Sequence, residues 1–180
     1  MKISFLCMNW TLALLIIIIT LNGCSIKTVP ISSNHKQETF EIQTKTNKEK
    51  CFETIIDFLT NNQISTRTID KINGLVITDE MKLSWSYESQ SGKLEKENAY
   101  TIVEKKIRPS NNLPIKPAIV TGIWNFRIKE TENGETKIAI FLSNIKAKQT
   151  DNMTSVTDEL ILKILSSGQF EKEFTEHINK

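Results

Sequence analysis

The sequence predicts an α+β domain: an antiparallel sheet with an N-terminal helix and a long C-terminal helix, both packed on one face. Two segments, at about residues 46–62 and 155–178, repeat hydrophobic residues at helical spacing. Between them, runs of alternating apolar and polar residues predict half-buried antiparallel strands. Asn-Gly pairs at 73–74 and 133–134 separate such runs and predict hairpin turns. Helices that flank a series of antiparallel strands are typical of the α+β class.

The first strand and helix are expected within residues 40–62. Alternation in Phe40–Ile42 predicts a strand. Thr46 followed by Glu49 forms a capping box, in which the Thr side chain accepts an amide N–H and the Glu reaches back to the cap. The apolar stripe of the helix then consists of Phe52, Ile55, Ile56 and Leu59, widened by Cys51 and Phe58. Asn61-Asn62 ends the helix, because Asn tolerates the left-handed turn.

The middle of the chain predicts two hairpins and two further strands. Ile64–Ile72 and Leu75–Met81 flank the first Asn-Gly pair, whose two residues both need positive φ in a tight hairpin turn. The run "KLSWSYE" at 82–88 alternates as a half-buried strand, and Tyr100–Ile107 is another. The second pair, Asn133-Gly134, joins two long strands whose inward residues are Trp124, Phe126, Ile128, Ile138, Ile140 and Leu142.

The C-terminal segment predicts one long helix. Ser155 stands three residues before Asp158, a weak capping signature. Its apolar stripe comprises Val156, Leu160, Ile161, Ile164 and Leu165, and continues as Phe170, Phe174 and Ile178. Ser166–Gly168 interrupts the stripe, so the helix is expected to bend or break there. Glu171 lies off the stripe, so Glu171→Ala is expected to change stability very little.

The leading segment indicates where the protein is held. Lys2 is followed by an apolar block at Leu12–Leu21, which ends in Leu21-Asn22-Gly23-Cys24. This tetrapeptide resembles the lipobox of bacterial lipoproteins. The resemblance implies that residues 1–23 are a signal peptide and that Cys24 carries a diacylglycerol after cleavage. The alternative is an uncleaved anchor helix in which Cys24 is incidental. Residues 24–38 are then expected to be the lipidated Cys and a flexible tether, and residues 39–180 a single domain.

The same resemblance implies a location in the cell envelope. Ser25 follows the cysteine where an Asp would favour the inner membrane in enteric bacteria, so we expect a lipid anchor in the outer membrane facing the periplasm. The order of elements also resembles helix-grip envelope lipoproteins such as the C subunit of the barrel assembly machine. No motif specific to that subunit is present, so its partners are not carried over.

Candidate chemical sites are few. The net charge of +2 favours no nucleic acid, and three cysteines (Cys7, Cys24 and Cys51) provide no disulfide framework. The known motifs for hydrolases, phosphate loops and metal sites are missing from the sequence, so no catalytic, cofactor or metal residue is predicted. Four further residues are expected to be structural or solvated: His35 and Asp79 in solvent, Cys51 in the core and His177 near a helix end. The acids Asp70 and Glu80 are likewise expected to be solvated.

These observations predict a membrane-anchored envelope lipoprotein that is a non-catalytic interaction module. It would bind another envelope protein through an exposed strand edge or the proline-rich loop Arg108–Ala118, which could equally be only flexible. The alternative is a carrier of a lipid or small apolar ligand in a cleft between the sheet and the C-terminal helix. A third possibility is an enzyme whose site is assembled from scattered residues. A cavity under the helix would favour the carrier, whereas a filled core with an exposed patch would favour the interaction module.

Overall fold

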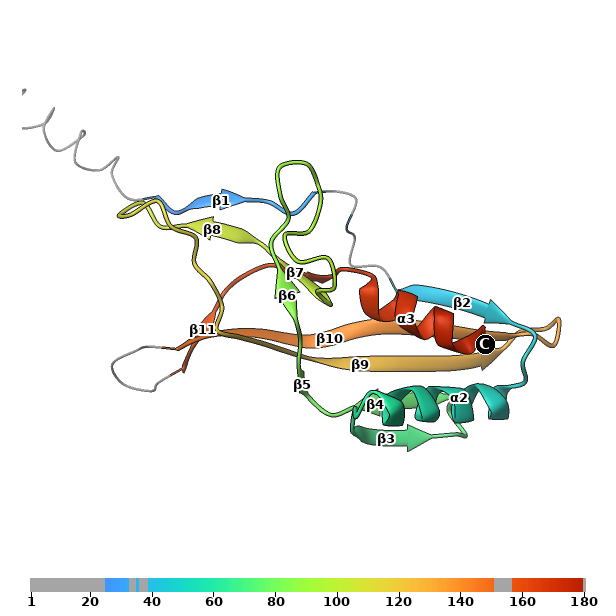
Figure 1. Ribbon diagram of the computed structural model, residues 1–180. Helices are drawn as coiled ribbons and strands as arrows, with labels where there is room; N and C mark the ends of the chain where they lie inside the picture. Colours follow the sequence, from blue (N-terminus) through green and yellow to red (C-terminus); the bar gives the residue numbers. More distant parts are fainter. Residues whose placement is uncertain (1–24, 33–34, 36–38, 151–156, 180) are drawn as a thin grey trace, which may run out of the picture. The chain divides into compact units, whose positions relative to one another are not determined.

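The computed structural model describes residues 25–32, 35, 39–150 and 157–179, which form an α+β protein with mostly antiparallel sheets and two helices (Figure 1). The contacts divide the chain into two units. The smaller unit contains the described residues up to Val29 together with Lys106–Ile115, and the larger unit contains the rest. The lipobox-like residues around Cys24, the expected signal peptide and the expected helix start at Ser155 lie outside the described residues. Among the described residues, no helix is both long and apolar enough to cross a membrane.

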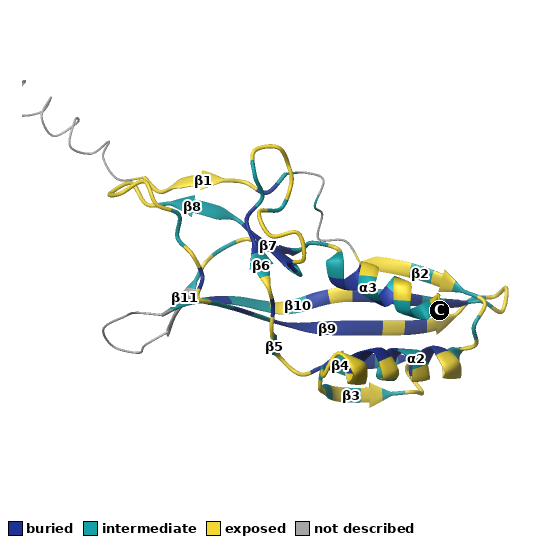
Figure 2. Ribbon diagram, in the orientation of Figure 1, coloured by how far each residue is buried: buried dark blue, intermediate teal, exposed yellow. Residues whose placement is uncertain are grey.

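The larger unit is built on a seven-stranded sheet in which every pair of strands is antiparallel. Its path is β11-β10-β9-β4-β3, with β2 beside β10 and β5 beside β9. The bounds are β2 Phe40–Thr44, β3 Thr66–Asp70, β4 Leu75–Thr78, β5 Met81–Lys82, β9 Ile119–Glu130, β10 Thr136–Thr150 and β11 Thr157–Leu160. Figure 2 shows that β9 is largely buried and that β10 alternates between buried residues and residues that are partly buried or exposed, whereas β2 and β3 at the edges contain no buried residue.

A second, three-stranded sheet lies in the same unit. It contains β12 (Ile164–Ser166), β7 (Thr101–Val103) and β6 (Trp85–Ser86), and the β6–β7 pair is parallel. Ile102 of β7, Leu165 of β12 and Ile31 are buried together as a small separate cluster.

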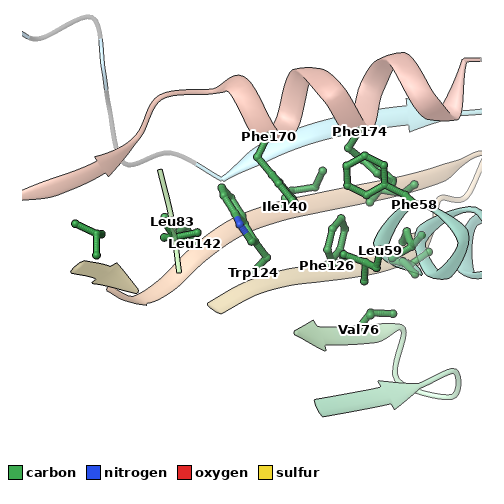
Figure 3. Packing of buried hydrophobic residues seen from close by; sticks show 14 of the residues in the cluster. Phe58, Leu59, Val76, Leu83, Trp124, Phe126, Ile140, Leu142, Phe170 and Phe174 are labelled. Atoms are coloured by element: carbon green, nitrogen blue, oxygen red, sulfur yellow. The ribbon is translucent and has the colours of Figure 1, made fainter. Parts of the chain in front are cut away.

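Helices α2 (Lys48–Asn61) and α3 (Gln169–Ile178) pack on the same face of the seven-stranded sheet. Phe58 of α2 contacts Phe170 and Phe174 of α3 edge-on, with ring centroids 5.5 and 5.2 Å apart. The ring of Phe170 stacks on Trp124 of β9 at 4.0 Å. Figure 3 shows these rings filling the layer between the helices and the two long strands.

The smaller unit is a two-stranded sheet with a closed loop. It pairs β1 (Lys27–Val29) with β8 (Lys105–Ile107). The loop after β8 is tied by backbone hydrogen bonds: the amide of Arg108 donates to the Leu113 carbonyl at 2.9 Å, and the amide of Ile115 donates to the Lys106 carbonyl at 2.7 Å. The expected tether therefore contains a strand, and the expected strand Tyr100–Ile107 is divided between two sheets.

The first predicted helix is present as α2, but it is not N-terminal, because β1 and β2 precede it. Its cap also differs by one residue from the prediction. The side chain of Asn47, not that of Thr46, accepts from the amide of Lys50 at 2.9 Å. The Thr46 hydroxyl instead lies 3.1 Å from the Thr44 hydroxyl.

The long C-terminal helix was predicted wrongly. Residues 157–160 and 164–166 are strands, and the helix has only ten residues, Gln169–Ile178. Ile164 belongs to the main core, whereas its neighbour Leu165 belongs to the small cluster, so the two point to opposite sides as in a strand. Ile161, assigned to the apolar stripe, is 89% exposed. Glu171, which the prediction placed off the apolar stripe, is buried.

Both predicted hairpins are confirmed, but their turns are longer than the two-residue type. The first hairpin closes with the pair Asp70 and Leu75, and the residues between them form the turn. Only Gly74 has positive φ, at 71°, while Asn73 is held by its amide and side chain on the carboxylate of Asp70. In the second turn Gly134 alone has positive φ. A Cβ at Gly74 would collide with the carbonyl of Ile128, so glycine is needed there for space as well as for backbone conformation.

Candidate functional site

One face of the seven-stranded sheet packs against both helices, and the opposite face carries charged and apolar side chains that are exposed or partly buried. Along β10, Lys137, Ala139 and Phe141 alternate with the buried Ile138 and Ile140, so they point away from the helices. Arg127 and Lys129 of β9 and Glu41 of β2 lie on that same outward side, as the register and their shared pocket place them. These six residues are called the open sheet face.

The open sheet face contains a shallow pocket of 280 Å³. Its lining consists of Thr39, Glu41, Arg127, Lys129, Lys137, Ala139 and Phe141. The carboxylate of Glu41 is paired with Lys137 at 2.7 Å. Arg127 and Lys129 have no acidic partner within 4.0 Å in the part of the chain that the structure describes. The pocket therefore combines two uncompensated cations with the exposed ring of Phe141.

Farther along β9 and β10, side chains on the same side of the sheet contact the carboxylate of Glu80. The Thr121 hydroxyl donates to Glu80 at 2.6 Å, and Lys146 lies 3.9 Å from the same carboxylate. The hydrogen bond from Thr121 and the nearby lysines Lys146 and Lys148 lower the pKa of Glu80. Glu80 is thus engaged locally, and the excess charge of this side remains positive.

A second hollow, at the start of α2, is less suited to a charged ligand. It has a volume of 400 Å³ and is lined by Asn47, Lys48, Glu49, Phe52, Lys71 and Glu130. Two cations and two acids balance one another there, and Lys48 donates to the carbonyl of Ile72 at 3.1 Å. We therefore regard the open sheet face as the candidate site.

The carboxylates considered as acid–base candidates do not form a pair. Asp70 accepts from both the amide and the side chain of Asn73, and the amide of Asn73 is the main cause of the lowered pKa of Asp70. Glu80 lies instead against Thr121 on β9. Asp79 is half exposed and lies 3.7 Å from Arg67. Each of these acids is bound to its own neighbour, which favours structural roles.

His35 was predicted to be solvated, and this prediction is wrong. Its Nε2 lies 3.5 Å from Oε1 of Glu88, whose other oxygen accepts from the amide of Ser32 at 2.6 Å. Burial alone would raise the pKa of Glu88, but hydrogen bonds from Ser32 and the proximity of His35 lower it. Ile31 is buried beside Ile102 and Leu165. These contacts pack the segment that follows β1 against other residues of the larger unit.

Cys51 and His177 both pack against other residues of the larger unit. Cys51 is fully buried, with its Sγ 3.6 Å from the carbonyl of Thr46, and burial raises the pKa of the thiol. The prediction of a buried small hydrophobe is confirmed, since a raised pKa disfavours the reactive thiolate. The ring of His177 packs on Phe58 with centroids 5.5 Å apart.

Sequence reasoning missed one buried carboxylate, Glu171. Its Oε1 accepts from the Ser166 hydroxyl at 2.7 Å, whereas Oε2 is buried without a partner among the described residues. Burial raises the pKa of Glu171. Nearby, the Tyr100 hydroxyl donates to Glu173 at 2.8 Å, and burial raises the pKa of Tyr100 to about 12. Within the described ranges, no group of three or more His, Cys, Asp or Glu residues could hold a metal ion.

Comparison of the chain with known proteins found no matching family model and no similar curated protein.

Proposed function

We propose that the protein is a lipid-anchored protein of the bacterial cell envelope whose folded part is a non-catalytic interaction module. The lipobox-like Leu21-Asn22-Gly23-Cys24 supports the anchor, with the lipid on Cys24. Ser25 after the cysteine supports the outer membrane, facing the periplasm. The partners are then the membrane, through the anchor, and another protein of the envelope.

The open sheet face is the observation that carries the interaction module. Arg127 and Lys129 are exposed and uncompensated beside the ring of Phe141, which is 36% exposed. Cations next to an apolar ring fit a partner protein that presents a carboxylate beside an apolar side chain. Arg is favoured in such contacts, because its guanidinium binds a carboxylate with two parallel hydrogen bonds.

The packing under the helices favours this proposal over a carrier. A carrier needs a cavity of several hundred cubic ångströms for an apolar ligand. Trp124, Phe126, Phe170 and Phe174 are instead fully buried in direct ring contact between the sheet and α3. The helix-grip likeness remains part of the proposal in a weaker form, with a short helix, α3, on one face of the sheet.

The anchor is tested on the protein processed in bacteria. Mass spectrometry of the mature N-terminal peptide should find a lipidated cysteine at residue 24. Cys24→Ala should leave the precursor uncleaved or release the protein from membranes. Normal processing and firm membrane retention of that variant would contradict the anchor.

The interaction is tested by photo-crosslinking in intact cells. A photoreactive phenylalanine analogue at Phe141 should give one discrete adduct with a second protein, and Arg127→Glu should abolish it. The same analogue at Ile72, which is 89% exposed in the β3–β4 turn, is the control position, and Lys93→Glu is the control charge reversal. Unchanged adducts in Arg127→Glu would contradict a role for this face. An adduct between two copies of the chain would also contradict the proposal and would assign the face to a homodimer.

A further inference from the structure

The charged residues in the described part of the smaller unit are all basic. Its described residues, Ser25–Val29 and Lys106–Ile115, include Lys27, Lys106 and Arg108 and contain no Asp or Glu. An acid-free basic surface of this kind is attracted to anionic groups, and the attraction weakens as salt is added.

The same unit also exposes apolar side chains. Ile26 is 52% exposed, Val29 37% and Leu113 58%. Leu113 lies on a loop whose shape is held by backbone hydrogen bonds, because its carbonyl accepts from the amide of Arg108 at 2.9 Å. Exposed aliphatic residues interspersed with Lys and Arg are typical of surfaces that bind at the interface of a bilayer.

The smaller unit begins close, along the chain, to the residue that is proposed to carry lipid. Strand β1 begins at Lys27, three residues after Cys24. An extended chain advances at most about 3.6 Å per residue, so β1 begins within about 11 Å of the residue proposed to carry lipid. Because β8 pairs with β1, the loop that bears Arg108 and Leu113 belongs to the same tethered unit. An anchored Cys24 therefore keeps the whole unit within reach of lipid headgroups.

We propose that the smaller unit is a membrane-contact surface that binds anionic phospholipid headgroups, an inference that rests on the proposed lipid anchor at Cys24. Lys27 and Arg108 contact the phosphates, while Ile26 and Leu113 enter the interface between headgroups and acyl chains. The loop Arg108–Ile115 is thereby given a role, which the sequence alone left open. The acyl chains on Cys24 keep the protein at the membrane. The smaller unit then docks on the membrane surface to an extent that depends on the lipid composition.

The test uses the full-length gene product, purified from bacteria in detergent and reconstituted into vesicles. Leu113→Cys carries an environment-sensitive dye. Cys51 of the larger unit is fully buried and does not compete for the dye, and the lipid proposed on Cys24 occupies that sulfur. Asn133→Cys is the reference position, because its turn is surrounded by Glu130, Glu132 and Glu135 and should be repelled by anionic lipid. Vesicles of phosphatidylcholine alone are compared with vesicles that also contain phosphatidylglycerol, and spin-labelled lipids quench dyes that enter the bilayer.

The dye at position 113 should shift to the blue and be quenched in the anionic vesicles, and added salt should reverse both effects. Each Lys or Arg near an anionic surface changes the docked-to-undocked ratio by about fivefold, so Lys27→Gln with Arg108→Gln should lower it about 25-fold. The matched pair Lys71→Gln with Lys93→Gln removes the same charge from exposed positions of the larger unit and should change nothing.

Equal behaviour of the dyes at 113 and 133 in anionic vesicles would overturn the inference, and so would equal effects of the two double variants. Mass spectrometry of the same samples reports the lipid on Cys24 separately. Lipid on Cys24 without quenching at 113 would overturn only the membrane-contact surface. Quenching in the Leu113→Cys sample but not in the Asn133→Cys sample, without lipid on Cys24, would overturn the lipid anchor and leave the contact surface standing.

Discussion

Phe170 should be the most sensitive single residue for stability. It is fully buried at the start of α3 and contacts both helix α2 and strand β9 in the main core. Its ring stacks on Trp124 at 4.0 Å and meets Phe58 and Tyr100 edge-on at 5.5 and 5.6 Å. Phe170→Ala removes these contacts together, and it leaves a cavity because the neighbouring rings are held by their own strands and helix.

The magnitude follows from known large-to-small substitutions. A buried Phe replaced by Ala typically costs about 3–5 kcal/mol of unfolding free energy. The total stability of a domain is about 5–15 kcal/mol, and 1 kcal/mol corresponds to about 2–4 °C in Tm at this chain length. Phe170→Ala should therefore lower Tm by roughly 6–20 °C or unfold the domain.

Thermal and urea unfolding followed by tryptophan fluorescence measure this loss, since Trp124 lies directly under the substituted ring. Phe40→Ala is the matched control, because Phe40 is 38% exposed on the edge strand β2 and should cost less than about 1 kcal/mol. If Phe170→Ala and Phe40→Ala melted together, α3 would not be part of the core, and the reasoning from ring contacts would be refuted.

Three further predictions concern a carboxylate, a turn and the chain after β1. Because burial raises the pKa of Glu171 above the usual 4.5, the contribution of Glu171 to stability should be fully present below that pH and be lost as pH rises through the raised pKa. Glu171→Gln should remove this component, as urea unfolding at several pH values measures. Gly74→Ala should destabilise far more than Gly134→Ala, which should cost only about 1–2 kcal/mol for its positive φ, because only at Gly74 would the new Cβ collide with Ile128. A chain that begins at residue 30 should melt higher than one that begins at residue 39, because Ile31 is buried.

Each of these predictions has a contrary outcome. Parallel pH profiles for the wild type and Glu171→Gln would mean that Glu171 titrates normally. Equal losses at Gly74 and Gly134 would mean that the backbone near Ile128 gives way. Equal melting of the two shortened chains would mean that Ile31 and the amide of Ser32 on Glu88 contribute nothing to the larger unit.

The elements that depend on neighbours in sequence could be predicted. Helix α2 follows from its apolar stripe at Phe52, Ile55 and Leu59 and from a capping side chain, which act over a few residues. The long hairpin of β9 and β10 follows from strict alternation on both sides of Asn133-Gly134. The length of the two turns could not be predicted, because two-residue turns and longer turns share the same Asn-Gly signal.

The C-terminal segment was misread because its spacing satisfies two structures. Leu160, Ile161, Ile164 and Leu165 fit a helical stripe, but they also fit two short strands with a break between them. The choice is made by β10 and β7, which supply hydrogen-bond partners for β11 and β12. Those partners are distant along the chain, so no local pattern could have indicated them.

The α+β class, the hairpins and the lipobox-like end of the leading segment could be predicted from the residues alone, because each depends on a short run of residue types. Which sheet face the helices cover is set by contacts between segments of the folded chain. That choice buries Phe170 and Glu171 on one side and leaves Arg127, Lys129 and Phe141 together on the other. Alternation in a strand separates two sets of side chains, but it does not say which set meets a helix, because that contact is made between segments far apart in the chain.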